Sequence, residues 1–475
     1  ALDGAPLRTV TLSGRLAQCI AHDRLQRGPV VDGGRSHDGR TIGVSAAELR
    51  MRSYPPSKET TVFKPIRNCA LASVLLLSLP AFAQTTPEPD PNLQLQAPGS
   101  GGGFVPAKIY ATLRQPDGKV LVGGDFTRLA DGTPRTRLLR LNVDGSLDSS
   151  FAPAINSLVS ACVIYALAWS NGSIYVGGTF DTINGSSSPN VARITSTGAL
   201  ASGWASPFPQ TSPGEVIRAL AATPTSLFIG GDIQRHDAFG LARLDAINGG
   251  WDFSWIAQTQ NGSVNNPPTG GTRGKVRALL ANAGDLLVGG DFLKIANLQV
   301  RGLARISQSA PVSVNAFDTG LSASGYRVSA LHADGARLYI GGNFFRQSAP
   351  FVDYLNRVDI NSGALDSTWQ PHTNGSIDAL ALDGGMLYVG GSFSNAIPPS
   401  GGNRLIRVAT TGNGAIDSTW NPSMNNSVLA LTHNCRSRMI AGGDFDVAGG
   451  VARNGLAGYL VANADCIFAS GFEMQ

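Results

Sequence analysis

The chain has 475 residues, of which 15% are charged, and it carries a formal net charge of +4. Residues 1–83 hold 11 basic and 6 acidic residues, a net of +5, which leaves −1 for the rest of the chain. The basic stripe that nucleic-acid binding requires is therefore absent, and we exclude nucleic acid as a partner.

Residues 51–83 have the organisation of a secretory signal peptide. Met51 precedes basic residues, an apolar run follows over residues 69–80, and Ala81-Phe82-Ala83 supplies the small-X-small cleavage motif. The run is too short to remain as a membrane helix. We therefore expect a mature protein that begins at Gln84 and is secreted, periplasmic or held in the cell envelope, as in a Gram-negative bacterium.

The segments on either side of this signal show no periodicity. Residues 1–50 are rich in Arg and Gly, and we interpret them as disordered upstream sequence translated ahead of a true start at Met51. The alternative is an unusually long basic region of the signal peptide. Residues 84–103 contain Pro, Gln and a Gly-Ser-Gly-Gly-Gly run, which is typical of a disordered linker.

A Gly-Gly doublet at the end of a short apolar run recurs seven times after residue 104. Successive doublets are separated by 54, 53, 59, 52, 49 and 52 residues. A period near 50 is typical of a repeat architecture with one supersecondary unit per period. The first glycines of the doublets are Gly123, Gly177, Gly230, Gly289, Gly341, Gly390 and Gly442.

Six of the seven units contain four short apolar runs that predict strands, and the seventh contains three. An Ala-Leu-like pair precedes a turn, and the doublet run follows. A third run comes next, with its arginine 13–17 residues after the first glycine in units one to six, and an aromatic residue closes these units. We therefore predict an all-β fold: a seven-bladed β-propeller of four-stranded antiparallel blades over residues 104–475. We expect the closing aromatic to pack between adjacent blades.

The seventh unit lacks the closing aromatic element. Phe104-Val105-Pro106, ahead of the first unit, imitates Phe151-Ala152-Pro153 at the end of that unit. We therefore predict that an N-terminal strand completes the last blade and closes the ring, which hides a sheet edge.

The pattern DGKVLVGGDF…GTPRTRLLRLNVDGSLDSSFAP, residues 117–153, closely resembles the bacterial delta-60 repeat, a β-propeller repeat of a domain of unknown function. All seven units fit it, over roughly residues 104–475. The doublets are also similar to kelch strand ends, but the Tyr and Trp spacing of kelch units is not followed. The delta-60 resemblance implies the propeller and supplies no established activity.

An arginine recurs in the third run of six units. Aspartates follow the doublet in four units (Asp125, Asp232, Asp291 and Asp444) and precede the closing aromatic in three (Asp148, Asp366 and Asp417). An Arg fork matches a carboxylate, so we predict one Arg–Asp tie within most blades, structural in role, with ligand binding as the alternative. The arginines are Arg140, Arg193, Arg243, Arg305, Arg357 and Arg407.

Three cysteines follow the signal segment. Cys435 and Cys466 both belong to the last unit, so a disulfide that clamps it is possible in an oxidising compartment. Sequence does not fix the Cα separation, and the reduced pair stays open as an alternative. Cys162 would then be an unpaired, buried thiol.

Catalytic signatures are absent from the sequence. It contains no Gly-X-Ser-X-Gly elbow and no His-X-X-Glu-His motif, and His332 and His433 are read as structural. We predict no catalytic, metal or cofactor residue. Loops 142–148 and 359–366 carry alternating oxygen ligands that leave calcium as an alternative, but neither ends in the Glu of a calcium loop, and Asx turns explain them more simply.

These observations favour a monomeric, non-enzymatic binding or scaffold module whose partner is an unknown protein or glycan. Recognition is expected where units differ, above all in the insertions 206–215 and 258–275. The alternative is a propeller enzyme, a hydrolase or lyase, that acts on an extracellular glycan or other polymer through Asp carboxylates.

Overall fold

The computed structural model describes residues 93–158, 161–210, 214–235, 238–261, 272–317, 319–320, 327–345, 352–394, 404–434 and 438–461. All of them belong to the unit Leu76–Gln475. They form strands and turns, and no helix in these ranges has the length and hydropathy of a membrane span. The predicted signal peptide, residues 1–50, Cys435 and Cys466 lie outside the described residues.

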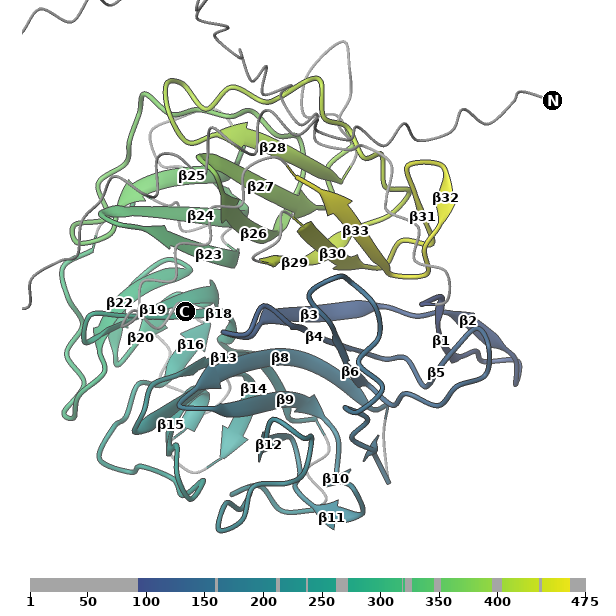
Figure 1. Ribbon diagram of the computed structural model, residues 1–475. Helices are drawn as coiled ribbons and strands as arrows, with labels where there is room; N and C mark the ends of the chain where they lie inside the picture. The colour runs from purple at the N-terminus through teal and green to yellow at the C-terminus, as the bar shows by residue number, and fades with distance from the viewer. Residues whose placement is uncertain are drawn as a thin grey trace, which may run out of the picture. The chain divides into compact units, whose positions relative to one another are not determined.

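Seven three-stranded antiparallel sheets in the described ranges each contain one Gly-Gly doublet, and we number the repeat units by these doublets (Figure 1). The doublet lies on the middle strand of each sheet. The first strands are β3 (Ile109–Arg114), β8 (Val163–Ser170), β13 (Val216–Ala222), β18 (Lys275–Asn282), β23 (Val328–Asp334), β26 (Ile377–Asp383) and β29 (Val428–Asn434).

The other two strands of each sheet follow in chain order. The middle strands are β4 (Val120–Gly124), β9 (Ser173–Thr179), β14 (Ser226–Arg235), β19 (Asp285–Asp291), β24 (Arg337–Phe345), β27 (Met386–Gly391) and β30 (Arg438–Gly443). The third strands are β6 (Leu138–Leu141), β12 (Val191–Ile194), β15 (Ala238–Asp245), β22 (Leu303–Ser307), β25 (Val352–Asp359), β28 (Leu405–Ala409) and β33 (Leu456–Leu460).

The Gly-Gly doublet is required by two close approaches. A Cβ on Gly289 would lie 2.7 Å from the side chain of Val328, which belongs to the next unit. A Cβ on Gly290 would overlap the carbonyl oxygen of Lys275 in the same sheet, where a register shift interrupts the pairing of β18 with β19. The first glycine therefore admits the neighbouring unit, and the second admits a bulge in its own sheet.

The same approach to the next unit is made by the first glycine of every doublet. Gly442 of unit seven faces Ile109 of unit one, so the last unit packs against the first as every other unit packs against its successor. The first strands β3, β8, β13, β18, β23, β26 and β29 contact one another in this order, and β29 also contacts β3. The seven sheets therefore succeed one another in a closed cycle.

The predicted fourth strand is reduced to single bridges among the described residues. In units one to six the third strand forms one isolated antiparallel bridge with the segment that follows it, such as Leu141 with Leu147 and Val358 with Leu365. The closing aromatic lies beyond that bridge, as predicted. Trp369 is buried edge-on against Tyr339, with ring centroids 5.2 Å apart, and its indole N–H donates to the Ala409 carbonyl of the next unit at 2.9 Å.

Short hairpins after the doublets form additional small sheets that the sequence analysis did not predict. Each of three such sheets receives a strand from the segment ahead of its unit. The sheets are β11-β10-β7 (Ser186–Ser187, Thr182–Ile183, Ile155–Asn156), β17-β16-β20-β21 (Thr272–Arg273, Thr259–Asn261, Lys294–Ile295, Leu298–Gln299) and β2-β1-β5 (Phe104–Pro106, Leu95–Pro98, Arg128–Leu129), beside the hairpin β31-β32 (Val447–Ala448, Val451–Ala452).

Two predictions about the N-terminal side of the fold are wrong. Residues 93–98 are not linker, because Leu95–Pro98 form β1, and the alternating Leu93, Leu95 and Ala97 are buried in the core that units one and seven share. Phe104–Pro106 do not complete the last blade. They form β2, which pairs with β1, and Phe104 is 45% exposed. The side chain of Gln94 instead reaches the last unit, donating to the Ala452 carbonyl at 2.8 Å.

Candidate functional site

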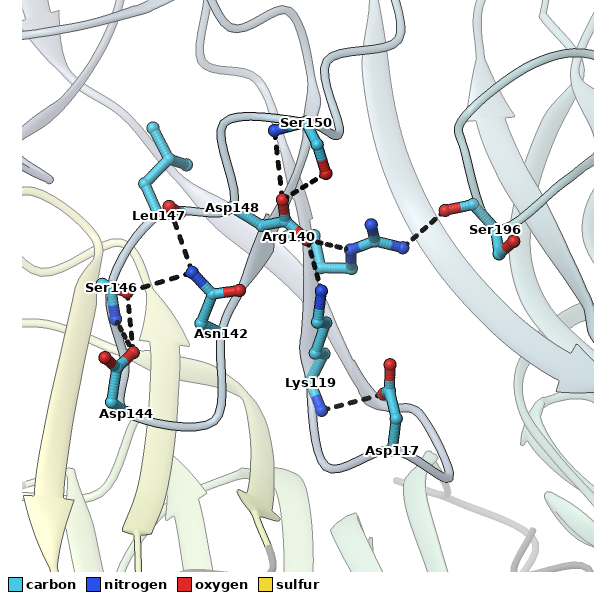
Figure 2. A network of polar contacts seen from close by, with 10 residues as sticks. All are labelled: Asp117, Lys119, Arg140, Asn142, Asp144, Ser146, Leu147, Asp148, Ser150 and Ser196. Atoms are coloured by element: carbon cyan, nitrogen blue, oxygen red, sulfur yellow. Dashed lines mark hydrogen bonds and ion pairs between the residues drawn. The ribbon is translucent and has the colours of Figure 1, made fainter.

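Five of the six third-strand arginines predicted from the sequence join two units among the described residues, and Arg140 illustrates the geometry (Figure 2). Its Nε donates to Oδ2 of Asp148 in the same unit at 2.9 Å. Its Nη1 donates to the Ser196 carbonyl of the next unit at 2.6 Å. The guanidinium also lies 4.4 Å from the ring centroid of the closing aromatic, Phe151. One side chain thus joins a carboxylate, an aromatic face and a neighbouring backbone.

The carboxylate in this network is strongly held. Burial raises the pKa of Asp148, but hydrogen bonds from Lys119, Ser150 and Arg140 outweigh it, and the net pKa lies well below its usual range. Lys119 Nζ donates at 2.8 Å and the Ser150 hydroxyl at 2.6 Å (Figure 2). Asp148 is therefore ionised at neutral pH.

Four more arginines repeat the tie, and one departs from it. The partners of Arg243, Arg305, Arg357 and Arg407 are Asp252, Asp285, Asp366 and Asp417. Arg193 has a hydroxyl instead, because its Nε donates to Ser173 Oγ at 2.9 Å. Nη1 reaches a carbonyl of the next unit in four of these arginines: Arg193 to Ile247, Arg243 to Gln308, Arg305 to Asn361 and Arg357 to Thr410.

The seventh unit makes this link with a different residue. Gly458 occupies the place of the third-strand arginine, opposite Ile440. Arg438, from the middle strand, donates instead to the Asp144 carbonyl of unit one, and Asn434 Nδ2 donates to the Val143 carbonyl at 2.8 Å. The last unit therefore holds the first through a substitute contact.

The aspartates that follow the doublets bind other partners. None of the four forms the predicted tie with a third-strand arginine among the described residues. Three of them join a basic side chain at the start of the next first strand: Asp232–Lys275 at 3.3 Å, Asp291–Arg327 at 3.3 Å and Asp444–Lys108 at 3.0 Å. Asp125 instead accepts a hydrogen bond from the Lys108 backbone N–H at 2.7 Å.

The loops considered for calcium use their oxygens in turns. Asp144 Oδ1 accepts from the Ser146 backbone N–H at 3.0 Å, and Asp359 Oδ1 accepts from the Ser362 backbone N–H at 2.8 Å. These are the Asx turns that the sequence suggested. Within the described ranges no group of three His, Cys, Asp or Glu side chains could hold a metal ion.

The predicted thiol and histidine positions can be placed in part. Cys162 is buried and free, and burial raises the pKa of its thiol. His332 and His433 lie toward the ends of first strands β23 and β29. Burial lowers the pKa of both, and the nearby Arg114 and His332 help to lower that of His433 to about 4. Both rings are therefore neutral at physiological pH.

All seven first strands line one cavity of about 220 Å³. The alanine and the leucine (threonine in unit one) of each Ala-Leu-like pair contribute the repeated part of its wall. The residue just before that pair also lines the cavity, and it is of five different types in the seven units. From unit one to unit seven it is Tyr110, Tyr165, Arg218, Arg277, Ser329, Asp378 and Leu429. We call these seven the channel residues.

Tyr110, Tyr165 and Arg218 form the aromatic part of the cavity. The two tyrosine rings meet edge to face, with centroids 4.8 Å apart, and the Arg218 guanidinium lies 5.1 Å from the Tyr165 ring centroid. Burial raises the pKa of both phenols. They therefore remain neutral hydrogen-bonding groups with apolar faces.

Arginines and one isolated acid form the polar part. Arg218 binds Asp232, and Arg277 binds Asp291 through Nε at 2.9 Å and Nη2 at 2.7 Å. Burial raises the pKa of Asp378, although Arg327 and Arg277 oppose that rise. Its one hydrogen bond among the described residues is a long one, 3.5 Å from Ser376 Oγ. Asp378 is thus the one channel carboxylate, and it has no bidentate partner there.

The described residues of the predicted insertions 206–215 and 258–275 do not line this cavity. Phe208 packs against Trp251, and Thr259 begins β16 of an outer small sheet. Residues 211–213 and 262–271 lie outside the described residues. The sequence analysis placed recognition in insertions of variable length, and it therefore did not identify the channel residues. The available signal was one variable column immediately before an almost invariant Ala-Leu pair.

Comparison with known proteins gives one family match. Residues 115–151 and 170–200 match the family model described as a domain of unknown function (DUF5122) beta-propeller. No curated protein matches the sequence.

Several solved structures are similar to the chain. An extracellular domain assigned to a hybrid two-component system from B. thetaiotaomicron is 17% identical with a TM-score of 0.42, and the chain spans 39% of its length while 77% of the chain is covered. Catalytically inactive virginiamycin B lyase from Staphylococcus aureus is 12% identical with a TM-score of 0.41, and the match covers 78% of this chain and 98% of the lyase. BamB from Moraxella catarrhalis is 14% identical with a TM-score of 0.37, and the match covers 76% of this chain and 89% of BamB. At these TM-scores the similarities carry no argument about function.

Proposed function

Because the chain carries DUF5122 beta-propeller repeats, we propose that it is a seven-bladed β-propeller that serves as a secreted or cell-envelope binding module, with its ligand site in the channel. The cyclic contacts of the seven first strands support seven blades, and the isolated bridges stand for a shortened fourth strand in each. The shared core of Leu95 with Ile440 and Leu456 supports closure by residues 93–98.

One observation carries the binding function. The column just before the Ala-Leu-like pair, which holds five residue types in seven units, lines the cavity. A side chain needed only for the fold recurs in each unit, whereas a ligand requires different groups around it. Tyrosines, arginines, a serine and an aspartate are the polar and aromatic groups that bind ligands in concave sites. The ligand is a glycan or a segment of an envelope protein.

The enzyme alternative rests on Asp378. A glycosidase of the common type uses two carboxyl groups on either side of the scissile bond. Asp232 and Asp291 are each held by an arginine, and Asp378 is the one acid among the channel residues. This arrangement favours binding without turnover. Cleavage of a polymer by the wild type that is lost in Asp378→Asn would favour the enzyme over the binding module.

The test is a glycan-array and envelope-protein capture screen with the full chain. We expect Tyr165→Ala and Arg277→Ala to weaken capture of the identified ligand at least tenfold while leaving the melting temperature within a few degrees. Phe253→Ala is the control, because Phe253 is 60% exposed and does not line the cavity. Equal capture by the wild type and both channel variants would refute the channel as the site.

A further inference from the structure

We propose that the channel takes an acidic saccharide, and that the ligand carboxylate binds a cationic side formed by Arg218, Lys275, Arg277 and Arg327. This inference rests on the binding function proposed above and names its ligand class. We call these four residues the cationic arc. They come from three consecutive units, three, four and five. Arg218 and Arg277 line the cavity, and Lys275 and Arg327 pair with the carboxylates that hold these two arginines.

The cationic arc holds more positive charge than its partners neutralise. Two carboxylates, Asp232 and Asp291, lie among the four cations: Asp232 pairs with Arg218 and Lys275, and Asp291 pairs with Arg277 and Arg327. Asp378, whose pKa Arg327 and Arg277 also affect, is a third carboxylate near these cations, so one positive charge is in excess on this side. Arg218, Arg277 and both paired carboxylates are more than two-thirds buried, so their fields are less screened than those of surface pairs.

Arg277 is aimed for a second partner. Its Nε and Nη2 are committed to Asp291, and no described residue accepts a hydrogen bond from its Nη1. The bond to Asp291 holds the guanidinium in one plane, so the remaining N–H groups are presented without further loss of side-chain freedom. A carboxylate is the group that an arginine fork matches best.

The rest of the cavity favours a sugar over an acidic peptide. Asp378 lines the same cavity, where it accepts hydrogen bonds from hydroxyl groups and repels further carboxylates. Tyr110 and Tyr165 offer neutral hydroxyls and apolar ring surface, and Ser329 adds a hydroxyl. A uronic acid carries one carboxylate, several hydroxyl donors and an apolar ring face on a single residue. A run of acidic side chains offers the charge without the hydroxyls.

The experiment is titration calorimetry of the full chain with tetramers of galacturonate, glucuronate and mannuronate, each compared with its methyl ester. We expect at least one uronate to bind, its methyl ester to bind at least thirtyfold more weakly, and Arg277→Gln to lose at least tenfold. Lys294→Gln is the charge-matched control, since Lys294 lies on β20 of an outer sheet, and it should bind as the wild type does.

Each other outcome has a defined meaning. If neutral glycans bind as well as acids and Tyr165→Ala abolishes both, the channel function stands and the acidic saccharide is wrong. If penta-aspartate binds more tightly than every uronate with the same dependence on Arg277, the ligand is an acidic peptide. If no uronate binds, the inference is overturned. If, in addition, no ligand in the array or capture screen depends on the channel residues, the proposed function fails with it.

Discussion

Arg305 and Arg277 belong to the same sheet and both pair with an aspartate, yet they belong to different systems. Arg305 Nε binds Asp285 at 2.7 Å, and its Nη1 holds the Asn361 carbonyl of the next unit. Arg277 binds Asp291 and faces a cavity. Arg305 has a counterpart in five other units, whereas only one other unit has arginine at the place of Arg277. Recurrence around the cycle marks what holds the units together, and, under the function proposed above, its absence marks where a ligand is selected.

The strongest way to break the recurring system is Gly290→Ala. The new Cβ would overlap the Lys275 carbonyl oxygen, which is backbone and cannot move aside cheaply. We expect a loss of about 3 kcal/mol or more in the free energy of unfolding, measured by urea denaturation. Gly101→Ala is the control, since nothing lies within 4 Å of its added Cβ. Equal stability of the two variants would contradict the role of the doublet.

Removal of one third-strand arginine should lower the free energy of unfolding by less than Gly290→Ala does. Arg357→Ala removes the pair with Asp366, the bond to the Thr410 carbonyl and the contact with Trp369, and we expect a loss of about 2–3 kcal/mol. Arg193→Ala, in the unit whose arginine has a serine partner, should lose only about 1 kcal/mol. Thermal and urea unfolding of both variants checks the difference. An Arg357→Ala variant as stable as the wild type would show that this arginine does not stabilise the fold.

Acid should weaken the Arg–Asp pairs of the third strands together. Hydrogen bonds from Thr368 and Arg357 lower the pKa of Asp366 to about 2, from an ordinary value of 3.8. Because the folded value is the lower one, this stabilisation is present above pH 4 and is lost as the pH falls toward 2. The pKa values of Asp148, Asp252 and Asp417 are lowered as well. Urea midpoints at pH 7, 4 and 3 should fall in the wild type and fall less in Arg357→Ala.

The smallest effect on stability is expected in the channel. Ser329→Ala changes a channel residue that has no counterpart in other units, and the free energy of unfolding should change by less than about 0.5 kcal/mol. Ligand affinity should fall while the melting curve overlays that of the wild type. A large loss of stability would mean that the channel residues also hold the fold, and the distinction drawn from Arg305 and Arg277 would disappear.

Much of this fold was readable because its landmarks repeat. The doublets, the third-strand arginines and the closing aromatics predicted seven like units, and the described sheets follow them in order. The carboxyl partners were predicted in part: Asp148, Asp366 and Asp417 were correct. Asp252 was missed although it lies three residues before Trp255, as Asp148 lies before Phe151. Asp285 was missed because it comes from the middle strand β19 and not from the segment before a closing aromatic.

The N-terminal strand was misassigned for a physical reason. Phe104-Val105-Pro106 copies the letters of Phe151-Ala152-Pro153, but the equivalent structural position is that of Ile155–Asn156, the strand that pairs with the hairpin of the next unit. Leu95 and Gln96 take that position against β5. Their signal was the apolar alternation from Leu93 to Ala97, which a Pro- and Gly-rich setting obscured.

The bond from Gln94 to Ala452 joins positions 358 residues apart in the chain. The entropic cost of closing so long a loop grows only with the logarithm of its length. This cost is smaller still once the intervening sheets have folded, because the loop left to close is then short. Each sheet added during folding therefore brings the two ends of the series closer, and the final contact is made between partners that have become near neighbours. We therefore expect the contact between units one and seven to form last. Folding becomes cooperative at this step, because it covers the last exposed sheet faces of the series.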